Sequence, residues 1–125
     1  MSDDLSVADR RILVIEDEVL IADNLCAGLS DLGAHVVARA TSIDDALALL
    51  QANSDVDAAM LDIKLGDEDA DRVAQALADR GIPFVFLTGY VQSALADRFP
   101  DAPVCEKPTT MDVIVNALLR VIAQS

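Results

Sequence analysis

The sequence predicts an α/β protein built on a doubly wound, five-stranded parallel sheet with helices on both faces. Short, fully apolar runs alternate along the chain with segments whose apolar residues recur at helical spacing. This alternation is typical of βαβ units, whose right-handed crossovers place helices on both faces of a parallel sheet. The chain has 125 residues, of which 53% are hydrophobic, so its size and apolar content fit a single domain.

The first strand and helix are indicated most clearly. Residues Ile12–Ile15 form an apolar run bounded by charges, as expected of a strand buried on both faces. Apolar residues then recur at helical spacing, at Ile21, Leu25, Leu29 and Leu32. The stripe stops before Gly33, a residue type that favours the left-handed position after a helix. We therefore expect a strand followed by a helix that ends at Gly33.

The same cycle repeats to the C-terminus. Four more strands are expected, at His35–Ala38, Ala58–Leu61, Pro83–Leu87 and Pro103–Cys105. A helix follows each of these strands. The first begins after the N-cap Ser42, with Asp45 three residues on, and the second runs from Val73 to Arg80 and is closed by Gly81. The third carries Val91, Leu95 and Phe99 at a spacing of four, and the last runs from the N-cap Thr110 through Ala123. We place an N-terminal extension at residues 1–10 and the folded domain at residues 11–125.

The charge balance argues against two classes of partner. Nine Lys and Arg residues against 22 Asp and Glu give a formal net charge of −13 at pH 7, which repels nucleic-acid phosphates and anionic lipids. Met1–Arg10 lacks the basic and apolar regions of a secretory signal. Cys26 and Cys105 lie in apolar stretches. We therefore expect a cytoplasmic protein with free thiols that binds neither nucleic acid nor membranes and has no attached output domain.

Polar and charged residues directly follow four of the predicted strands. These groups are Glu16-Asp17-Glu18, Asp62, Thr88-Gly89-Tyr90 and Glu106-Lys107-Pro108. Because reactive groups of an open parallel sheet gather at the carboxyl ends of its strands, we expect them in one crevice. Carboxylates there would repel one another, by ~4 kcal/mol for a pair about 4 Å apart at an effective dielectric of ~20. A hard divalent cation such as Mg²⁺, with a phosphoryl oxygen as a further ligand, would relieve this repulsion.

The order of these groups is an acidic pair, a single Asp, a Thr with a small neighbour, and a Lys-Pro pair. In this order the sequence resembles the receiver domain of two-component response regulators over almost the whole chain. The resemblance implies a flavodoxin-like receiver fold in which Asp62 is the phosphoacceptor. It further implies that Mg²⁺ is bound by Asp17, Asp62 and the backbone carbonyl of Lys64. Glu16 would then orient a metal-bound water.

The resemblance gives the remaining site residues their expected roles. Lys107 would pair with one phosphoryl oxygen, and the Thr88 hydroxyl would donate to another. The Lys107-Pro108 bond is expected to be cis. The phosphoryl group would come from a sensor histidine kinase or a histidine phosphotransfer protein. The domain would act as a signalling protein that catalyses only its own phosphorylation and dephosphorylation.

The region after the fourth strand departs from the usual receiver pattern. Val104 stands where receivers usually carry an aromatic residue three positions before the lysine. Instead, the segment from Pro83 to Tyr90 resembles the Phe-x-Thr-Gly-x-Tyr signature of the single-domain "FAT GUY" receivers, with the aromatic directly after the glycine. This resemblance implies general stress signalling and a switch in which Thr88 moves toward phosphate while Gly89 re-aims Tyr90.

The loop after Asp62 also departs from the pattern. Many receivers have Met-Pro there and a glycine three residues beyond, whereas this chain has Leu65-Gly66 and then Ala70, so the shape of the loop is not predicted. Its acidic residues are interpreted as a solvated charge run without a site role: Asp67, Glu68, Asp69 and Asp71. His35, the only histidine, opens a strand away from the predicted site and is interpreted as structural.

The terminal helix suggests a contact surface. One polar stripe at a spacing of four contains Asp112, Asn116, Arg120 and Gln124. Apolar residues fill the rest of the circumference, an arc wider than one sheet face needs. We favour a homodimer or partner surface over deeper burial beneath neighbouring helices.

Three alternative functions use a similar fold. A haloacid dehalogenase-like phosphatase also has an aspartate nucleophile and Mg²⁺, but it needs a second Asp two residues on, where this chain has Lys64. A flavin-binding protein of this fold needs a phosphate loop after the first strand, where this chain is acidic and would repel phosphate. A third alternative is a binding module of the same fold that is never phosphorylated. Such a module would not need the site residues Asp17, Asp62, Thr88 and Lys107, and their presence argues against it.

Overall fold

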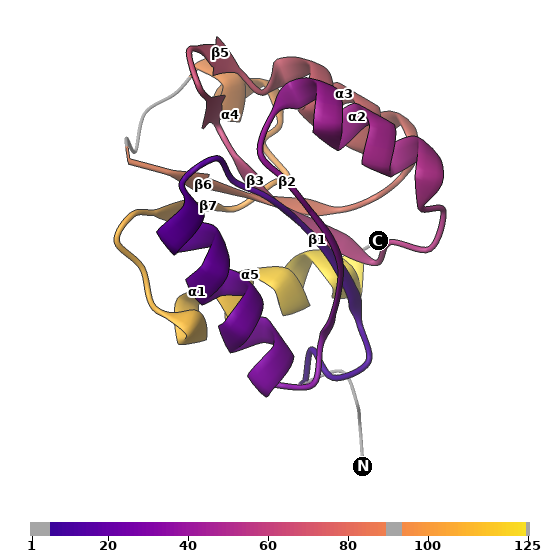
Figure 1. Ribbon diagram of the computed structural model, residues 1–125, viewed down its shortest axis with the longest axis vertical. Helices are drawn as coiled ribbons and strands as arrows, with labels where there is room; N and C mark the ends of the chain where they lie inside the picture. The colour runs from indigo at the N-terminus through magenta and orange to yellow at the C-terminus, as the bar shows by residue number, and fades with distance from the viewer. Residues whose placement is uncertain (1–5, 90–93, 125) are drawn as a thin grey trace.

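A computed structural model describes residues 6–89 and 94–124 of the protein. Its main sheet has five parallel strands in the order β2-β1-β3-β6-β7 (Figure 1). These strands are β1 (Arg11–Ile15), β2 (His35–Ala40), β3 (Ala58–Asp62), β6 (Phe84–Thr88) and β7 (Val104–Glu106). The predicted doubly wound fold is confirmed, with strand ends that differ from expectation by a residue or two.

Helices cover both faces of the sheet (Figure 1). On one face lie α1 (Val19–Asp31) and α5 (Met111–Gln124), and on the other α2 (Ile43–Ala52), α3 (Asp71–Asp79) and α4 (Ala94–Arg98). Successive residues of β1 point to opposite cores: Leu13 and Ile15 pack with α2 and α3, and Ile12 and Val14 with α1 and α5. None of the described helices combines the length and apolarity needed to cross a lipid bilayer.

Local signals in the sequence mark the helix ends. The Ser42 hydroxyl accepts a hydrogen bond from the Asp45 amide at 3.1 Å, as predicted for the N-cap of α2. Gly33 and Gly81 adopt φ values of 89° and 70° after α1 and α3, which is the left-handed region predicted for them. The Thr110 hydroxyl accepts from the Val113 amide at 3.5 Å at the start of α5. These predicted helix ends are therefore confirmed.

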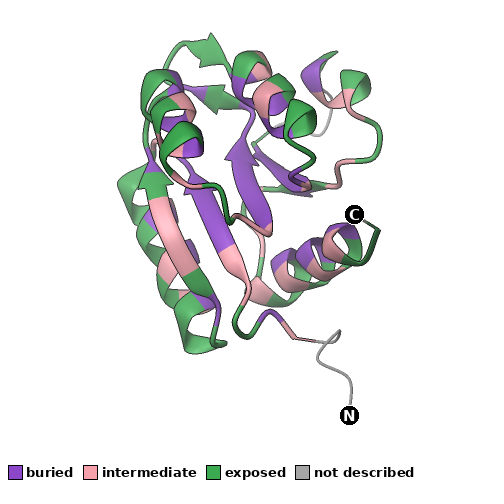
Figure 2. Ribbon diagram, turned by 90° about the vertical axis from the view of Figure 1, so that its right-hand side faces the viewer, coloured by how far each residue is buried: buried purple, intermediate pink, exposed green. Residues whose placement is uncertain are grey.

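Burial follows the position of each strand in the sheet (Figure 2). Every residue of β3 and β6 is buried, whereas most of the edge strand β2 is half-buried or exposed. Central strands covered on both faces are apolar up to their last residue, Asp62 in β3 and Thr88 in β6, which is why they were visible in the sequence. Val7 is also buried and joins the core beneath α1 and α5. The domain boundary after residue 10 stays a prediction.

A hairpin after β3 was not predicted. Strands β4 (Lys64–Leu65) and β5 (Glu68–Asp69) pair antiparallel directly after β3. Gly66 lies in the turn with φ 65°, a conformation that favours a residue without a Cβ. The hairpin brings Gly66 to the carboxyl edge of the main sheet, where its amide contacts Asp17.

The helix α5 packs much of its apolar arc against the sheet. The buried residues are Ile114, Ala117, Leu118 and Val121, and those partly buried in the same core are Met111, Val115, Leu119 and Ile122. Val113 is a large apolar side chain that remains exposed, at 49%. A partner surface on α5 stays a prediction, and it would include Val113.

Both cysteines are free thiols, as expected. Cys105 is buried in β7 and Cys26 is half-buried on α1. Burial raises the pKa of both thiols. Because reactivity requires the thiolate, these cysteines serve as packing residues.

Candidate functional site

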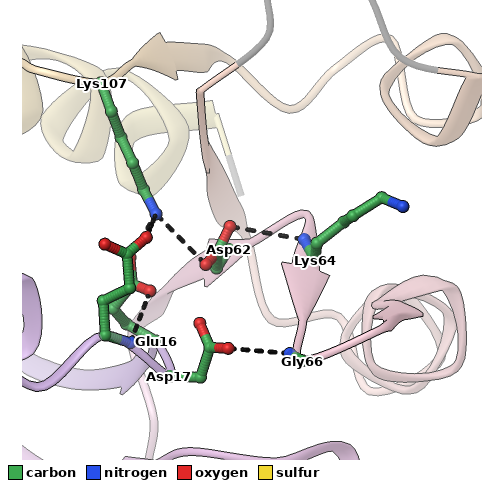
Figure 3. A network of polar contacts seen from close by, with 7 residues as sticks. Glu16, Asp17, Asp62, Lys64, Gly66 and Lys107 are labelled. Carbon is green, nitrogen blue, oxygen red and sulfur yellow. Dashed lines mark hydrogen bonds and ion pairs between the residues drawn. The ribbon is translucent and has the colours of Figure 1, made fainter.

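The five-stranded sheet collects the predicted site residues at one edge. Asp62 and Thr88 are the last residues of β3 and β6, while Glu16 follows β1 and Lys107 follows β7. Parallel strands end on the same side of a sheet, so all four residues lie at one edge, and the side chains of Glu16, Asp62 and Lys107 meet although they are far apart in sequence (Figure 3). Glu16, Asp62 and Thr88 are the buried polar residues of the described chain, at 1%, 5% and 4% exposure.

Lys107 lies at the centre of the site (Figure 3). Its Nζ is 2.8 Å from Glu16 Oε1, 3.1 Å from Glu18 Oε1 and 3.2 Å from Asp62 Oδ2. The Lys107 side chain is 15% exposed, and those of Glu16 and Asp62 are still less exposed. One ammonium group is therefore shared by two buried carboxylates and one at the rim, and it does not balance all three.

These surroundings shift the pKa values of the central pair. Burial, with the Glu16 carboxylate nearby, raises the pKa of Asp62 to about 7 against the opposing effect of Lys107. Burial alone would lower the pKa of Lys107, but the surrounding carboxylates outweigh burial and raise it. Lys107 is thus charged at neutral pH, while Asp62 is close to its titration midpoint. A further cation at the site would favour the ionised form of Asp62.

Asp17 is held from the opposite side. Its Oδ2 accepts a hydrogen bond of 2.8 Å from the Gly66 amide at the hairpin turn (Figure 3). Burial acts to raise the pKa of Asp17, but this bond and other hydrogen bonds outweigh burial and lower it. The hairpin therefore orients an ionised carboxylate beside Asp62.

The carboxylates could hold a metal ion. Glu16, Asp17, Glu18 and Asp62 each offer an oxygen within 4.8 Å of the others. Glu16 Oε1 is buried, and its polar contact among the described residues is with the Lys107 ammonium at 2.8 Å. Four carboxylates around a single ammonium group leave an excess of negative charge that suits a further cation, and an all-oxygen donor set suits Mg²⁺. The residues present therefore fit Mg²⁺.

Lys64 contributes its backbone rather than its ammonium group. Its amide donates to Asp62 Oδ1 at 3.3 Å. The side chain points away from the site (Figure 3) and its Nζ lies 3.8 Å from Asp69 Oδ1. This placement puts the Lys64 main chain beside the predicted phosphoacceptor; metal binding by its carbonyl stays a prediction.

Thr88 joins the site at the end of β6. Its carbonyl accepts a hydrogen bond of 2.6 Å from the Lys107 amide, which ties the two segments together. The Lys107-Pro108 peptide bond is cis, as expected. Gly89 is exposed beside Thr88. Tyr90 lies outside the described residues, so its switching role stays a prediction.

Two contributors were missed from the sequence. Glu18 was noted in the acidic run but given no role of its own, yet it contacts Lys107. Gly66 was placed in a loop of unknown shape, yet its amide holds Asp17. Gly-Asp flanked by potential strands is a recognised two-residue hairpin signal and could have indicated the turn. The Glu18 contact carries no comparable sequence signal.

Comparison with known proteins assigns the family. A model of the response regulator receiver domain family matches residues 12–118, most of the chain. The protein therefore belongs to the response regulator receiver domain family. PdtaR, a transcriptional regulatory protein of Mycobacterium tuberculosis, is 31% identical over 113 residues, which cover 87% of this chain and 55% of PdtaR. The chain thus spans about half the length of this curated relative.

Solved structures agree with this assignment. The solution structure of SdrG from Sphingomonas melonis Fr1 is 41% identical with a TM-score of 0.80, covering 94% of this chain and 98% of SdrG. SdrG in a BeF3-activated conformation, described from Pseudomonas melonis Fr1, is 40% identical with a TM-score of 0.76, covering 92% and 98%. The response regulator PhyR from Brucella abortus is 28% identical with a TM-score of 0.82, covering 98% of this chain and 51% of PhyR.

Family membership narrows the alternatives. Receiver domains are signalling domains that bind Mg²⁺ at an acidic pocket and interact with a kinase or a phosphotransfer partner. The chain is therefore grouped with these domains rather than with haloacid dehalogenase-like phosphatases or flavin-binding proteins of similar fold.

Proposed function

We propose that this protein is a receiver that accepts a phosphoryl group on Asp62 from a phosphohistidine donor and signals through protein contacts. The single observation that carries the proposal is the contact of Lys107 Nζ with Asp62 Oδ2 at 3.2 Å inside a pocket of carboxylates. This arrangement provides a nucleophilic oxygen and a fixed cation beside it, as transfer of a phosphoryl group requires.

The transfer follows from the chemistry of Asp62. A carboxylate oxygen of Asp62 attacks the phosphorus of a phosphohistidine, so an O–P bond forms while the N–P bond breaks. The bonding electron pair leaves with the imidazole nitrogen of the donor. Lys107 moves its ammonium toward a phosphoryl oxygen and offsets the charge that gathers there. The Thr88 hydroxyl, at the end of the neighbouring strand, donates to another phosphoryl oxygen.

Mg²⁺ completes the site. Asp17, Asp62 and the Lys64 backbone carbonyl are the proposed ligands, with Glu16 orienting a bound water. The ion supplies electrostatic stabilisation of the transferring phosphoryl group. The Gly66 amide keeps Asp17 aimed at this position, and the buried Glu16 oxygen, which lies 2.8 Å from the Lys107 ammonium, would gain a second cationic neighbour.

Partners and setting follow from the same proposal. The donor is a sensor histidine kinase or a histidine phosphotransfer protein, and output passes through protein contacts as phosphate sink, relay or effector. The high similarity to SdrG, which adopts a BeF3-activated conformation, supports a phosphoryl-responsive site in this chain. A cytoplasmic setting, a role in stress signalling and a Tyr90 switch that depends on Thr88 and Gly89 are part of this proposal.

Labelling with a small phosphodonor tests the proposal. The protein is incubated with the donor and Mg²⁺, and intact mass spectrometry is expected to show the gain of one phosphoryl group that is stable to acid and labile to base. Asp62→Asn and chelation of Mg²⁺ should each abolish the gain. Retention of the adduct in Asp62→Asn, or absence of labelling by small donors and phosphohistidine proteins alike, would refute the assignment.

A further inference from the structure

Lys107 is paired with three carboxylates, although a lysine that binds a phosphoryl group needs an N–H available for a phosphoryl oxygen. An ammonium group has three N–H donors. In this structure, Glu16, Glu18 and Asp62 all lie within 3.2 Å of Lys107 Nζ. These three carboxylates surround the ammonium group, so a phosphoryl oxygen that approaches Lys107 must compete with them.

Glu18 differs from the other two carboxylates in its exposure. The Glu18 side chain is 61% exposed, against 1% for Glu16 and 7% for Asp62. A displaced Glu18 carboxylate would turn into water, whereas a displaced buried carboxylate would lose its compensation in a dry setting. Glu18 is thus the partner whose release costs least.

The backbone around Glu18 allows such a movement. Glu18 is the N-cap residue of α1, and its side chain makes no capping hydrogen bond. Its amide donates to Glu16 Oε2 at 3.1 Å, which fixes the main chain while the carboxylate extends to Lys107. Release of Lys107 therefore requires a side-chain rotation and no change of fold.

We propose that Glu18 is a positioning residue that holds Lys107 in the unphosphorylated protein and releases it when a phosphoryl group reaches Asp62. The inference rests on the proposed function and adds a competitor for the phosphoryl-binding lysine. Glu18 and a phosphoryl oxygen compete for one ammonium group. Removing the competitor should strengthen binding of a phosphoryl mimic.

The same release would alter a groove beside the site. Glu18 and Lys107 both line a cavity of about 430 Å³ between α1 and the start of α5. Apolar side chains of Ile21, Leu87 and Ile114 form part of its wall. Breaking the Glu18–Lys107 pair therefore changes the polar rim of the groove, and methyl resonances of Ile21 and Ile114 should report this change.

Two substitutions separate the contact from its charge. Glu18→Gln keeps the length of the side chain and removes its charge. Glu18→Asp keeps the charge, withdraws it by one methylene and gives α1 a good capping residue. Glu68→Gln removes the same charge from the hairpin, where Glu68 forms no ion pair with Lys107 among the described residues.

The measurement is beryllofluoride binding at saturating Mg²⁺, followed by ¹⁹F NMR. Both Glu18 variants are expected to bind beryllofluoride about 3–5-fold more tightly than the wild type, and Glu68→Gln less than about 2-fold more tightly. Without beryllofluoride, the Ile21 and Ile114 methyl signals of Glu18→Asp should shift toward their positions in the liganded wild type.

Several outcomes would overturn the inference. If Glu18→Asp binds like the wild type while Glu18→Gln and Glu68→Gln improve equally, charge alone explains the effect. If either Glu18 variant binds Mg²⁺ about tenfold more weakly, Glu18 is a metal ligand instead. If the wild type binds no beryllofluoride, the proposed function fails and the inference with it. Normal wild-type binding with unchanged Glu18 variants refutes the inference alone.

Discussion

The Lys107 ammonium group is the residue-scale feature on which the acidic pocket depends. It faces two nearly buried carboxylates, Glu16 and Asp62, and is itself only 15% exposed. Removing one partner of a buried ion pair leaves an uncompensated charge that costs more than the pair itself contributes. Burying these carboxylates around one lysine therefore costs some folding stability, as is common at functional sites.

Substitution of this lysine should destabilise the fold. We expect Lys107→Gln to lower the free energy of unfolding by about 3 kcal/mol at pH 7.5, because Glu16 and Asp62 lose their cation. Urea unfolding followed by circular dichroism measures the change. Lys64→Gln is the matched control, since its side chain is 63% exposed and pairs loosely with Asp69, and it should change stability by less than about 1 kcal/mol. Equal effects of the two substitutions would contradict this account of the pocket.

Asp62 gives the stability of the metal-free protein a distinctive pH dependence. Its pKa is raised from 3.8 to about 7 in the folded protein, so between these values the folded state binds a proton that the unfolded state releases. The stabilisation that this proton provides is present below about pH 4 and is lost as the pH rises through 7. Asp62→Asn does not titrate and escapes this loss.

Thermal unfolding without divalent cations should therefore separate the two proteins as the pH rises. We expect the melting temperature of Asp62→Asn to exceed that of the wild type by a margin that widens between pH 5 and 8. At the upper end the margin should reach several degrees, which corresponds to a difference of about 2 kcal/mol in the free energy of unfolding. The comparison of the two proteins cancels the titration of carboxylates that do not interact with Asp62. A margin that stays constant across this pH range would show that Asp62 is not perturbed as described.

The positions of single residues were predictable where the fold alone decides them. Asp62, Thr88 and Lys107 end or follow strands, so strand prediction was sufficient to bring them to one edge. The contact between Glu18 and Lys107 was not predictable in this way. It depends on the direction of a side chain at the start of a helix, which sequence periodicity does not encode.

At the scale of elements, burial explains what the sequence revealed. The strands β3 and β6 are buried at every residue, and they appear as apolar runs that end in the polar residues Asp62 and Thr88. Capping residues marked the ends of α1, α2 and α3 for local steric and hydrogen-bonding reasons. The hairpin of β4 and β5 was missed because two-residue strands are too short to show a period of two.

The conformation of Gly66 should control the position of Asp17. Gly66 has φ 65° with open space around it, so Gly66→Ala meets no steric clash and suffers only the backbone cost of about 1 kcal/mol. We expect Gly66→Ala to weaken Mg²⁺ binding several-fold by displacing the amide that holds Asp17. Gly66→Asn tolerates positive φ and should stay closer to the wild type. Calorimetric Mg²⁺ titrations that rank Asn no better than Ala would argue against this role of the turn.

At the scale of the whole molecule, charge and apolar exposure limit the partners. A net charge of −13 opposes association with nucleic acids and anionic lipids. The contact surface predicted on α5 would include Val113, which is 49% exposed beside partly buried neighbours. The free apolar area of α5 is smaller than its sequence predicts, because helical periodicity does not show how deeply a helix sits against a sheet.

Sedimentation tests this surface. If the protein forms homodimers through α5, Val113→Glu should shift the sedimentation coefficient toward that of a monomer. The same substitution should lower the free energy of unfolding by no more than about 1 kcal/mol. Leu20→Glu places the same charge on α1, where Leu20 is 78% exposed, and should leave the distribution unchanged. A wild type that is monomeric at all concentrations would exclude the homodimer and leave a heterologous partner as the remaining use of this surface.

The most direct test of the account is calorimetric titration of Mg²⁺ into the wild type and Asp17→Asn, with Asp67→Asn as a control for charge on the neighbouring hairpin. The central claim is that the carboxylates around Lys107 take up Mg²⁺ and thereby prepare Asp62 to hold a phosphoryl group. We predict binding in the millimolar range or tighter for the wild type and Asp67→Asn, and a loss of about tenfold or more in Asp17→Asn. No binding to the wild type, or equal binding to Asp17→Asn, would contradict the account.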